Sequence, residues 1–552
     1  MKLLVCCLII IANVSNNGKA SIENIVPSNT NILLPDTTKS SDKSCYRPCK
    51  FNVKPRRCQY NFKIEPTLED DGRPAIVVNG MTPGPSIHVC LNDIVVVKVH
   101  NKVPGQDLTL HWHGIDQKGT PYMDGVPMVT QCPIGFGSIF QYAFVASSPG
   151  TLFYHADSVN HHSDGVYGSL IVDQPQPLEP HASLYDFDKS KENTLTIGAR
   201  FSALLTGNSV KNMKPDSLVI NGKGKSSKIF VIPGYHYRLR LINAIAVQCP
   251  LIIDIDQHSV IAIASDGKPV KPVSTNSVLL YPGERMDVIV EAAREGGGYW
   301  LNVRGFDACE GLSCHGMLIY SGFNYTSLLE QDPTLSSAVV TNIESVLHGQ
   351  KMLSLRDQSP VKDVKTTYLG IDRNVIAFKD ADNDYRYLSD VVPKKNYYPA
   401  ALSIQDIGVV QINNKNFLYP NEMYLLKSRF GSNDSYSFHM HGYSVEVVAT
   451  GKTADGKPIS KKEFQILDRK GGIERNLRNP PLKDTFVVPN KGYTIVRLKP
   501  DRGGSWMLEC RACSSFSLPV AILIDVPLSI PKAVVQALPK CGSYKPADVL
   551  LN

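Results

Sequence analysis

The chain has 552 residues, of which 43% are hydrophobic and 20% are charged, and its formal net charge is +7. These proportions are typical of a globular protein rather than a disordered one, and the length is sufficient for three or four domains. The positive charge is mild and no dense run of lysine or arginine occurs, so we expect no nucleic-acid partner.

The N-terminus has the pattern of a secretory signal peptide. Lys2 precedes an apolar run at 3–14, and a polar stretch then ends at Ala20, which predicts cleavage of residues 1–20. No later segment reaches eighteen apolar residues, so we expect no membrane span and a secreted, extracellular protein. Asn324 and Asn433 lie in glycosylation motifs, which agrees with secretion. The sequence does not name the extracellular partner.

The cysteines favour disulfides. The chain has thirteen cysteines, two of them in the signal peptide, so eleven remain and at least one is unpaired within the chain. Cys45, Cys49 and Cys58 predict a stapled leader, which we assign to residues 21–54, just ahead of the first strand. Cys309 and Cys314 are spaced to close a local loop.

Short β-rich runs, broken by proline, glycine, asparagine and aspartate, occupy most of the remaining chain. Alternating runs such as YRLRLI at 237–242 predict strands with one buried face. Strands at this spacing over several hundred residues predict β-sandwiches in series. We place the three domains at 55–175, 180–345 and 395–530, with a linker at 346–394 and a C-terminal tail at 531–552.

Two similar histidine motifs lie in the first and third predicted domains. HWHG carries His111 and His113, and HMHG carries His439 and His441, each at the end of a β-rich run, which indicates a repeated domain. Residues i and i+2 of a strand point to the same side, so each pair can face one site. Imidazole is the usual protein ligand of copper and zinc. Together with His155 in FYHAD, these residues predict a metal site between domains.

These motifs resemble those of the multicopper oxidases, and within that family those of insect laccases. The resemblance covers nearly all of residues 45–530 and implies an all-β fold of three cupredoxin-like, Greek-key β-sandwich domains in series. It further implies copper sites in the third domain and between the first and third. The segments that carry it are CYRPCKFNVKPRRC (45–58), VNGMTPGP (78–85), LHWHGIDQKGTPYMDGVPMVTQCPI (110–134), TLFYHADSVNHHSDGVYGSLIV (151–172), IAIASDG (261–267) and NPPLKDTFVVPNKGYTIVRL (479–498).

Compared residue by residue, the family's copper motifs are incomplete. Asp157 stands where the family has a cluster histidine, and Tyr436 stands at a ligand of the mononuclear copper. Glu509 and Arg511 flank Cys510 where the family has histidines. The next histidine and the axial ligand of that segment are replaced by Ser515 and Val520.

The mononuclear copper that receives electrons needs two histidines and a thiolate, and only Cys510 remains. We therefore predict a secreted multicopper-oxidase-related protein without laccase activity and with a binding or structural role. The alternative is a copper-binding oxidoreductase with partial copper occupancy, acting on phenols, ascorbate-like reductants or metal ions. Cys510 and Cys513 form a C-x-x-C pattern, for which we expect a local disulfide or a buried thiol.

For the intact pair of the resemblance, His111 with His439, two interpretations stay open. The pair binds copper or zinc at partial occupancy, or it persists as hydrogen-bonded interface residues. We expect no other cofactor.

Two interpretations also stay open for Asp157, His441 and Glu509. They bind a harder metal such as iron or manganese, or they form a salt-bridged network with Arg511. We expect the neighbouring His161 and His162 in a surface loop.

Overall fold

Strands dominate the architecture. The only α-helices in the described segments are α1 (Val159–Ser163) and α4 (Lys461–Arg469), and neither is long and apolar enough to cross a bilayer. The computed structural model describes residues 45–206, 214–223, 227–326, 346–357, 365–372, 375–379, 408–411, 421–427, 435–452, 461–511 and 520–526.

The first sandwich consists of two four-stranded sheets, in the orders β2-β1-β4-β6 and β3-β8-β7-β5. Its core includes Trp112, Tyr142 and Phe144, and the valines at 95, 97 and 99 of β4 face this core, as the alternating pattern of that strand requires. The strands are β1 (Arg57–Leu68), β2 (Pro74–Val78), β3 (Ile87–Cys90), β4 (Ile94–Asn101), β5 (Leu110–His113), β6 (Ile139–Val145), β7 (Gly150–Ala156) and β8 (Tyr167–Asp173).

The second sandwich consists of two six-stranded sheets, β10-β9-β12-β17-β14-β15 and β11-β19-β18-β13-β16-β20. Its core includes Leu239, Leu251 and Val290. The strands are β9 (Thr194–Arg200), β10 (Ser217–Ile220), β11 (Lys228–Val231), β12 (His236–Asn243), β13 (Leu251–Ile255), β14 (Val260–Ser265), β15 (Lys268–Thr275), β16 (Ser277–Leu280), β17 (Arg285–Glu291), β18 (Gly298–Gly305), β19 (Ser313–Tyr320) and β20 (Leu347–His348).

The third sandwich has sheets in the orders β22-β21-β24-β29-β26-β27 and β23-β31-β30-β25-β28. Phe438, Phe486 and Trp506 lie in its core. The strands are β21 (Lys365–Asp372), β22 (Val375–Lys379), β23 (Gly408–Gln411), β24 (Asn421–Lys427), β25 (Tyr436–Met440), β26 (Val445–Lys452), β27 (Leu482–Lys483), β28 (Thr485–Val488), β29 (Gly492–Leu498), β30 (Gly504–Cys510) and β31 (Val520–Val526).

The three sandwiches repeat one topology. Each has a parallel pair in one sheet, namely β1 with β4, β9 with β12 and β21 with β24. Each also has a parallel pair in the other sheet, namely β3 with β8, β11 with β19 and β23 with β31. In the second sandwich β16 and β20 form one further parallel pair. The other named strand pairs are antiparallel, which is the mixture that Greek-key sandwiches show. This repetition confirms the all-β class and the three-sandwich series.

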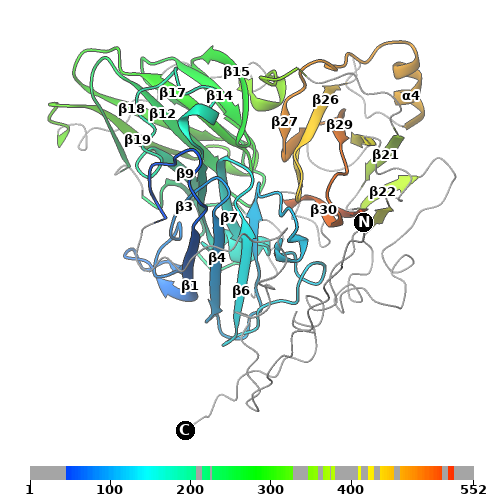
Figure 1. Ribbon diagram of the computed structural model, residues 1–552, viewed down its shortest axis with the longest axis horizontal. Coiled ribbons are helices and arrows are strands. Elements are labelled where there is room, and N and C mark those ends of the chain that lie inside the picture. Colours follow the sequence, from blue (N-terminus) through cyan, green and yellow to red (C-terminus); the bar gives the residue numbers. More distant parts are fainter. Residues whose placement is uncertain are drawn as a thin grey trace, which may run out of the picture.

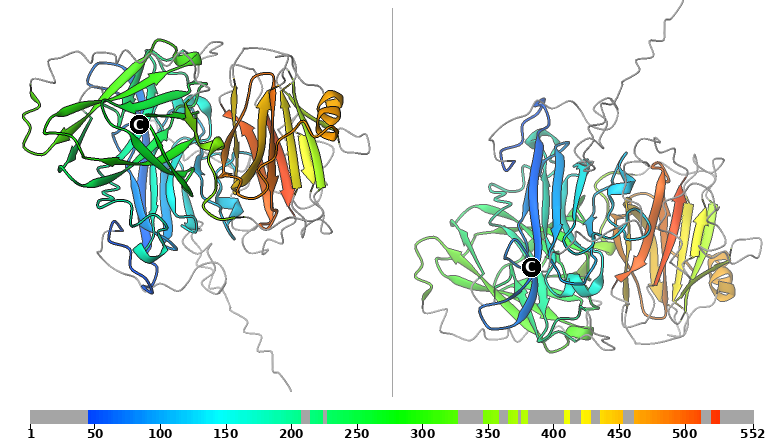
Figure 2. Two further views of the ribbon diagram at one scale, coloured as in Figure 1. Left: turned by 90° about the horizontal axis from the view of Figure 1, so that it is seen from above. Right: turned by 90° about the horizontal axis from the view of Figure 1, so that it is seen from below.

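The third sandwich, yellow to red in Figure 1, lies beside the blue first and the green second. Figure 2 shows the same arrangement from above and below. Contacts between domains, described below, place the first and third domains against each other at the predicted histidines. Strands β21 and β22 lie within 346–394, so part of the segment assigned as a linker contributes to the third sandwich. Charged residues interrupt the apolar pattern there, which hides the strands from a sequence reading.

The disulfides confirm the stapled leader and correct one pairing. Cys45 bonds Cys58, and Cys49 bonds Cys90 of β3. The prediction that Cys309 and Cys314 close a local loop is wrong. Cys309 instead forms a disulfide with Cys249, and their Cα atoms are 5.2 Å apart. Residue 314 is instead a buried free thiol on β19, where the strand holds its side chain in the core of the sandwich.

Candidate metal centre

The five predicted histidines converge on one cluster between the first and third sandwiches. Strands β5 and β7 are antiparallel neighbours and place His111 opposite His155. His113 follows two residues later on β5, while β25 of the third domain carries His439 and leads into His441. None of these side chains is more than 4% exposed. The structure therefore brings together all five, from strands that are more than 280 positions apart in the chain.

His111 and His439 face each other as two neutral imidazoles. Their Nε2 atoms are 3.1 Å apart. The Nδ1 of His111 lies 2.8 Å from the backbone oxygen of Asp124, and the Nδ1 of His439 lies 3.0 Å from that of Asp484. A carbonyl oxygen only accepts, so each Nδ1 carries the proton and each Nε2 presents its lone pair to the other ring. Burial lowers the pKa of His111 well below its usual range and lowers that of His439 as well.

Metal-binding histidines adopt this orientation: a carbonyl oxygen fixes the protonated nitrogen, here Nδ1, and the other nitrogen, here Nε2, is free to coordinate. Two lone pairs that face each other at 3.1 Å repel, and a cation between them would relieve this repulsion. His111 and His439, with His441, also form one of the groups whose ligand atoms lie within 4.8 Å of each other. The donor set of the pair fits a single copper or zinc ion.

His113 and His155 are held by partners on several sides. The Nδ1 of His113 lies 3.3 Å from the Nε2 of His155, and the Nε2 of His113 lies 2.8 Å from the hydroxyl of Thr485. The Nδ1 of His155 donates to the backbone oxygen of Ala156 at 2.9 Å. Burial lowers the pKa of both imidazoles well below the usual range, and the charge of Arg511 adds to this effect at His155.

The remaining histidine lies between two carboxylates. Asp124 Oδ2 is 2.8 Å from the Nδ1 of His441, and Glu509 Oε1 is 3.3 Å from its Nε2. Although burial disfavours the charge, these carboxylates raise the pKa of His441 to about 10. Both ring nitrogens of an imidazolium are donors, so this ring has no lone pair for a metal. In this protonated form His441 is part of an ionic network with Asp124 and Glu509, and its ring also lies in one of the histidine groups that could hold a metal ion.

Arg511 completes that network. Its guanidinium donates to Glu509 Oε1 at 3.0 Å and lies 3.7 Å from Asp157 Oδ1, and it also donates to the backbone oxygens of Ala156 and Asp157. Despite burial, Arg511 and the hydrogen bond from His441 lower the pKa of Glu509 to about 2. Burial and the charge of Glu509 raise the pKa of Asp157 to about 7. The predicted ion pairs of Arg511 with both acidic residues are confirmed.

Cys510 ends strand β30, is 4% exposed and is disulfide-bonded. A disulfide at Cys510 excludes the free buried thiol, whereas the local pairing with Cys513 stays a prediction. A metal binds the thiolate form of cysteine, which a disulfide sulfur cannot supply. Tyr436 is buried in the same core as Cys510. Cys513, Ser515 and the side chain of Val520 lie outside the described residues.

Several supporting residues escaped the sequence reading. Asp484, just before β28, accepts two hydrogen bonds from Arg285 of the second domain at 2.6 and 2.5 Å. Its Oδ1 lies 3.3 Å from the Nε2 of His113, and its backbone oxygen holds His439. The middle sandwich therefore braces the histidines of the other two. The available signal was an aspartate between apolar strands in KDTFVV, and similarly Asp124 in YMDGVP.

The prediction of a surface loop for the two adjacent histidines is wrong. His161 and His162 are 4% and 3% exposed, because α1 packs back against β7. The ring of His162 stacks on that of His155 with centroids 4.6 Å apart, and its Nε2 donates to the backbone oxygen of Ala244 at 2.8 Å. The sequence did not predict this contact because His162 lies several residues after β7. The short helix α1 reverses the direction of the chain and brings His162 back to His155.

Models of multicopper oxidase domains match residues 63–177, 186–318 and 422–513 of the chain. The chain belongs to the multicopper oxidase family. Laccase-1 of Botryotinia fuckeliana is 27% identical over 459 residues, covering 80% of this chain and 77% of the laccase. The L-ascorbate oxidase of Cucurbita pepo var. melopepo is 27% identical over 503 residues, covering 78% of this chain and 87% of that enzyme.

Solved structures share the fold of this multicopper oxidase. The laccase from Botrytis aclada superposes with a TM-score of 0.70 at 22% identity, over 88% of this chain and 91% of the laccase. Fet3p, a multicopper oxidase that functions in iron import, gives a TM-score of 0.67 at 19% identity, over 87% of this chain and 94% of its own. The likeness to insect laccases remains a prediction from the sequence.

Proposed function

We propose that this member of the multicopper oxidase family is a secreted protein that has lost its electron-entry copper and does not carry out laccase-type oxidation. It acts in the extracellular space by binding a partner or by a structural role. The observation that carries this proposal is the disulfide at Cys510. The resemblance places the copper thiolate at this sulfur, and a mononuclear blue site requires that thiolate together with two histidines.

The ionic network supports the same proposal for the cluster. In the family pattern the positions of Glu509 and Arg511 supply histidines that connect the cysteine to the cluster. Here Arg511 is a permanent cation directed toward the cluster and bound to Glu509 at 3.0 Å. A fixed guanidinium repels a metal ion, and its pairing with two carboxylates keeps the interface polar without one.

The facing nitrogens of His111 and His439 favour a second activity, the binding of one copper ion per chain. Copper at this pair would supply a Lewis-acidic and redox-active centre. The chain's own part is to keep both imidazoles neutral, because burial lowers their pKa and the backbone oxygens of Asp124 and Asp484 hold the outer protons. Partial-occupancy oxidation of phenols, ascorbate-like reductants or metal ions is the alternative function.

Metal analysis of the secreted protein, combined with an oxidase assay on a diphenol, tests these proposals. We expect no intense blue absorption, no turnover, and at most one copper per chain. A full set of family coppers with turnover contradicts the loss of the electron-entry site. Copper at one per chain with slow turnover favours the alternative. The assay uses protein purified from culture medium, so the same preparation shows whether the chain is secreted and cleaved after Ala20.

Glycosylation at Asn324 and Asn433 belongs to the same proposal. Asn324 lies in an exposed turn after β19, where Thr326 donates to its side-chain oxygen from the backbone and from the hydroxyl. Asn433 lies outside the described residues. An enzymatic deglycosylation shift on a denaturing gel, lost in Asn324→Gln, tests the first site.

A further inference from the structure

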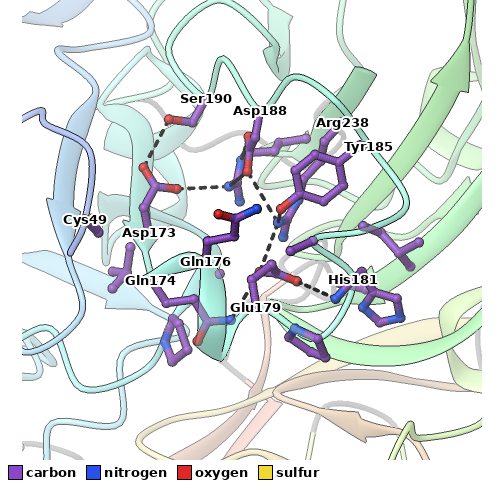
Figure 3. A pocket seen from close by; sticks show the side chains of 18 of the residues that line it. Cys49, Asp173, Gln174, Gln176, Glu179, His181, Tyr185, Asp188, Ser190 and Arg238 are labelled. Carbon is purple, nitrogen blue, oxygen red and sulfur yellow. Dashed lines mark hydrogen bonds and ion pairs between the residues drawn. The ribbon is translucent and has the colours of Figure 1, made fainter. Parts of the chain in front are cut away.

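A second, larger cavity lies between the first and second sandwiches, away from the histidine cluster. Its volume is about 590 Å³, and none of its lining residues belongs to the metal centre. Its lining includes the stapled leader around Tyr46, the stretch that follows β8, and β12 of the second domain, together with the start of β7 and the β14–β15 turn. A volume of this size suits a small organic molecule. Figure 3 shows the polar side chains that converge on it.

Two arginines form the floor of this cavity and both are already bound by carboxylates. Arg238 donates to Asp287 at 2.6 Å, to Glu179 at 3.2 Å and to Asp188 at 3.3 Å. Both arginines are nearly fully buried, at 4% and 2% exposure. Arg240 contacts Asp188 at 2.6 Å, Asp173 at 3.0 Å and Asp287 at 3.5 Å.

The acidic groups outnumber the basic ones. The two guanidinium groups pair with four carboxylates, of which Asp173, Glu179 and Asp188 line the cavity. This cluster therefore carries a formal charge of −2, whereas the whole chain carries +7. Arg47 also lines the cavity, but Asp93 binds it at 2.7 and 2.8 Å. Asp186 adds another acidic group at the rim, beside His236. A negative surplus in a partly enclosed space repels anions and favours a cation.

Uncharged polar groups at the wall also remain available. His181 lines the cavity, is 3% exposed, and its Nε2 has no hydrogen-bond partner in the part of the chain that the structure describes. A buried polar atom without a partner is destabilising, so a ligand that pairs with it is favoured. The amide of Gln176 extends into the cavity in Figure 3. Tyr46 is 43% exposed at the same wall, which leaves aromatic surface for a cation.

We propose that this cavity binds a small organic dication with two amino groups, of the linear diamine class. Each ammonium group donates to carboxylate oxygens of the cluster, and the two positive charges of the diamine offset a negative surplus that is −2 for the cluster and larger when Asp186 is included. A dianion meets the surplus with like charge, and a neutral diol leaves it uncompensated. This inference is independent of the copper proposal, because the two sites share no lining residue.

Three ligands of one length separate these cases: 1,4-diaminobutane, butane-1,4-diol and succinate, each titrated calorimetrically into the full mature protein. We expect binding of the diamine alone, weakening as salt rises, together with a higher melting temperature. Equal binding of the diol, or binding of succinate, overturns the proposal. Absence of diamine binding at low ionic strength also overturns it.

Charge-neutralising variants locate the site. Glu179→Gln removes one buried charge without changing volume, and we expect about tenfold weaker diamine binding. Asp186→Asn, whose side chain is 47% exposed and tolerates change, should weaken binding by about threefold. Asp71→Asn, an exposed carboxylate on the β1–β2 turn, is the matched control and should bind as the parent does. Unchanged affinity in both cavity variants contradicts the proposal, and the exposed Asp186 variant keeps the test valid if Glu179→Gln fails to fold.

Discussion

The histidine cluster has two sides that share an environment but differ in charge. On one side His111 and His439 are neutral, with facing Nε2 atoms and outer nitrogens on backbone oxygens. On the other side His441 lies between Asp124 and Glu509 and carries a proton, and Arg511 pairs with Glu509. Burial is nearly equal on both sides, so the partners decide which imidazole can bind a metal. A backbone oxygen leaves an imidazole neutral, whereas carboxylates on both nitrogens make it a cation.

The largest expected effect is on copper affinity. His439→Ala removes one of the two facing nitrogens and should weaken Cu²⁺ binding by at least about 100-fold. His441→Gln should leave the affinity within about threefold, because the ring in the parent protein has no free lone pair. Competition with a chelator of known affinity measures both. An equal loss of Cu²⁺ affinity in the two variants would contradict the assignment of His439 as a ligand and of His441 as a protonated ring.

The next effect concerns the ionic side. Arg511→Ala leaves Glu509 and Asp157 buried without their cation and should lower the free energy of unfolding by about 3 kcal/mol. Urea denaturation measures it. Arg478→Ala is the control, because its side chain is 82% exposed and its ion pair with Asp357 should contribute less than about 1 kcal/mol. A loss no larger than that of the control would show that the network does not stabilise the interface.

A second buried network joins Glu284 to His348 and Lys483, and it shows how a fall in pH acts on buried ion pairs. Although burial opposes ionisation, His348 and Lys483 lower the pKa of Glu284 to about 2. Because this pKa is depressed, the stabilisation is present above about pH 4.5, the ordinary value, and is lost as the pH falls toward 2. Glu284→Gln should therefore cost about 2 kcal/mol at pH 7 and little near pH 2. Denaturation across this range checks it, and a cost that does not depend on pH refutes the assignment.

The smallest effect concerns a shared hydroxyl. Thr485 Oγ1 lies 2.8 Å from the Nε2 of His113 and 3.3 Å from the Nδ1 of His439. Thr485→Val keeps the shape of the side chain and should destabilise the fold by about 1 kcal/mol. Copper affinity should change little, because the backbone oxygen of Asp484 still holds His439. A loss of affinity as large as that of His439→Ala would make the hydroxyl a principal support of the pair.

Much of the fold and the cluster could be predicted from local patterns. Period-two alternation correctly predicted a strand at 237–242, but the expectation of one buried face was wrong there, because carboxylates cover Arg238 and Arg240. The His-x-His spacing placed each pair on one strand face. The predictions that were wrong concern contacts between residues that lie far apart in the chain. The partner of Cys309 is sixty positions away, and His162 returns to the cluster through a short helix. No prediction was made for Asp124, Asp484 and Arg285, because their burial depends on domain packing, which local patterns do not show.

The sequence by itself determined which atoms are available: five histidines, no histidine beside Cys510, and Glu509 and Arg511 in their place. These identities already removed two of the ligands that a mononuclear copper requires. Only the tertiary structure decided the protonation of the remaining rings. A pKa depends on burial and on charges within a few ångströms, and those neighbours come from three domains. Packing alone put carbonyls behind His111 and His439 and carboxylates on both nitrogens of His441.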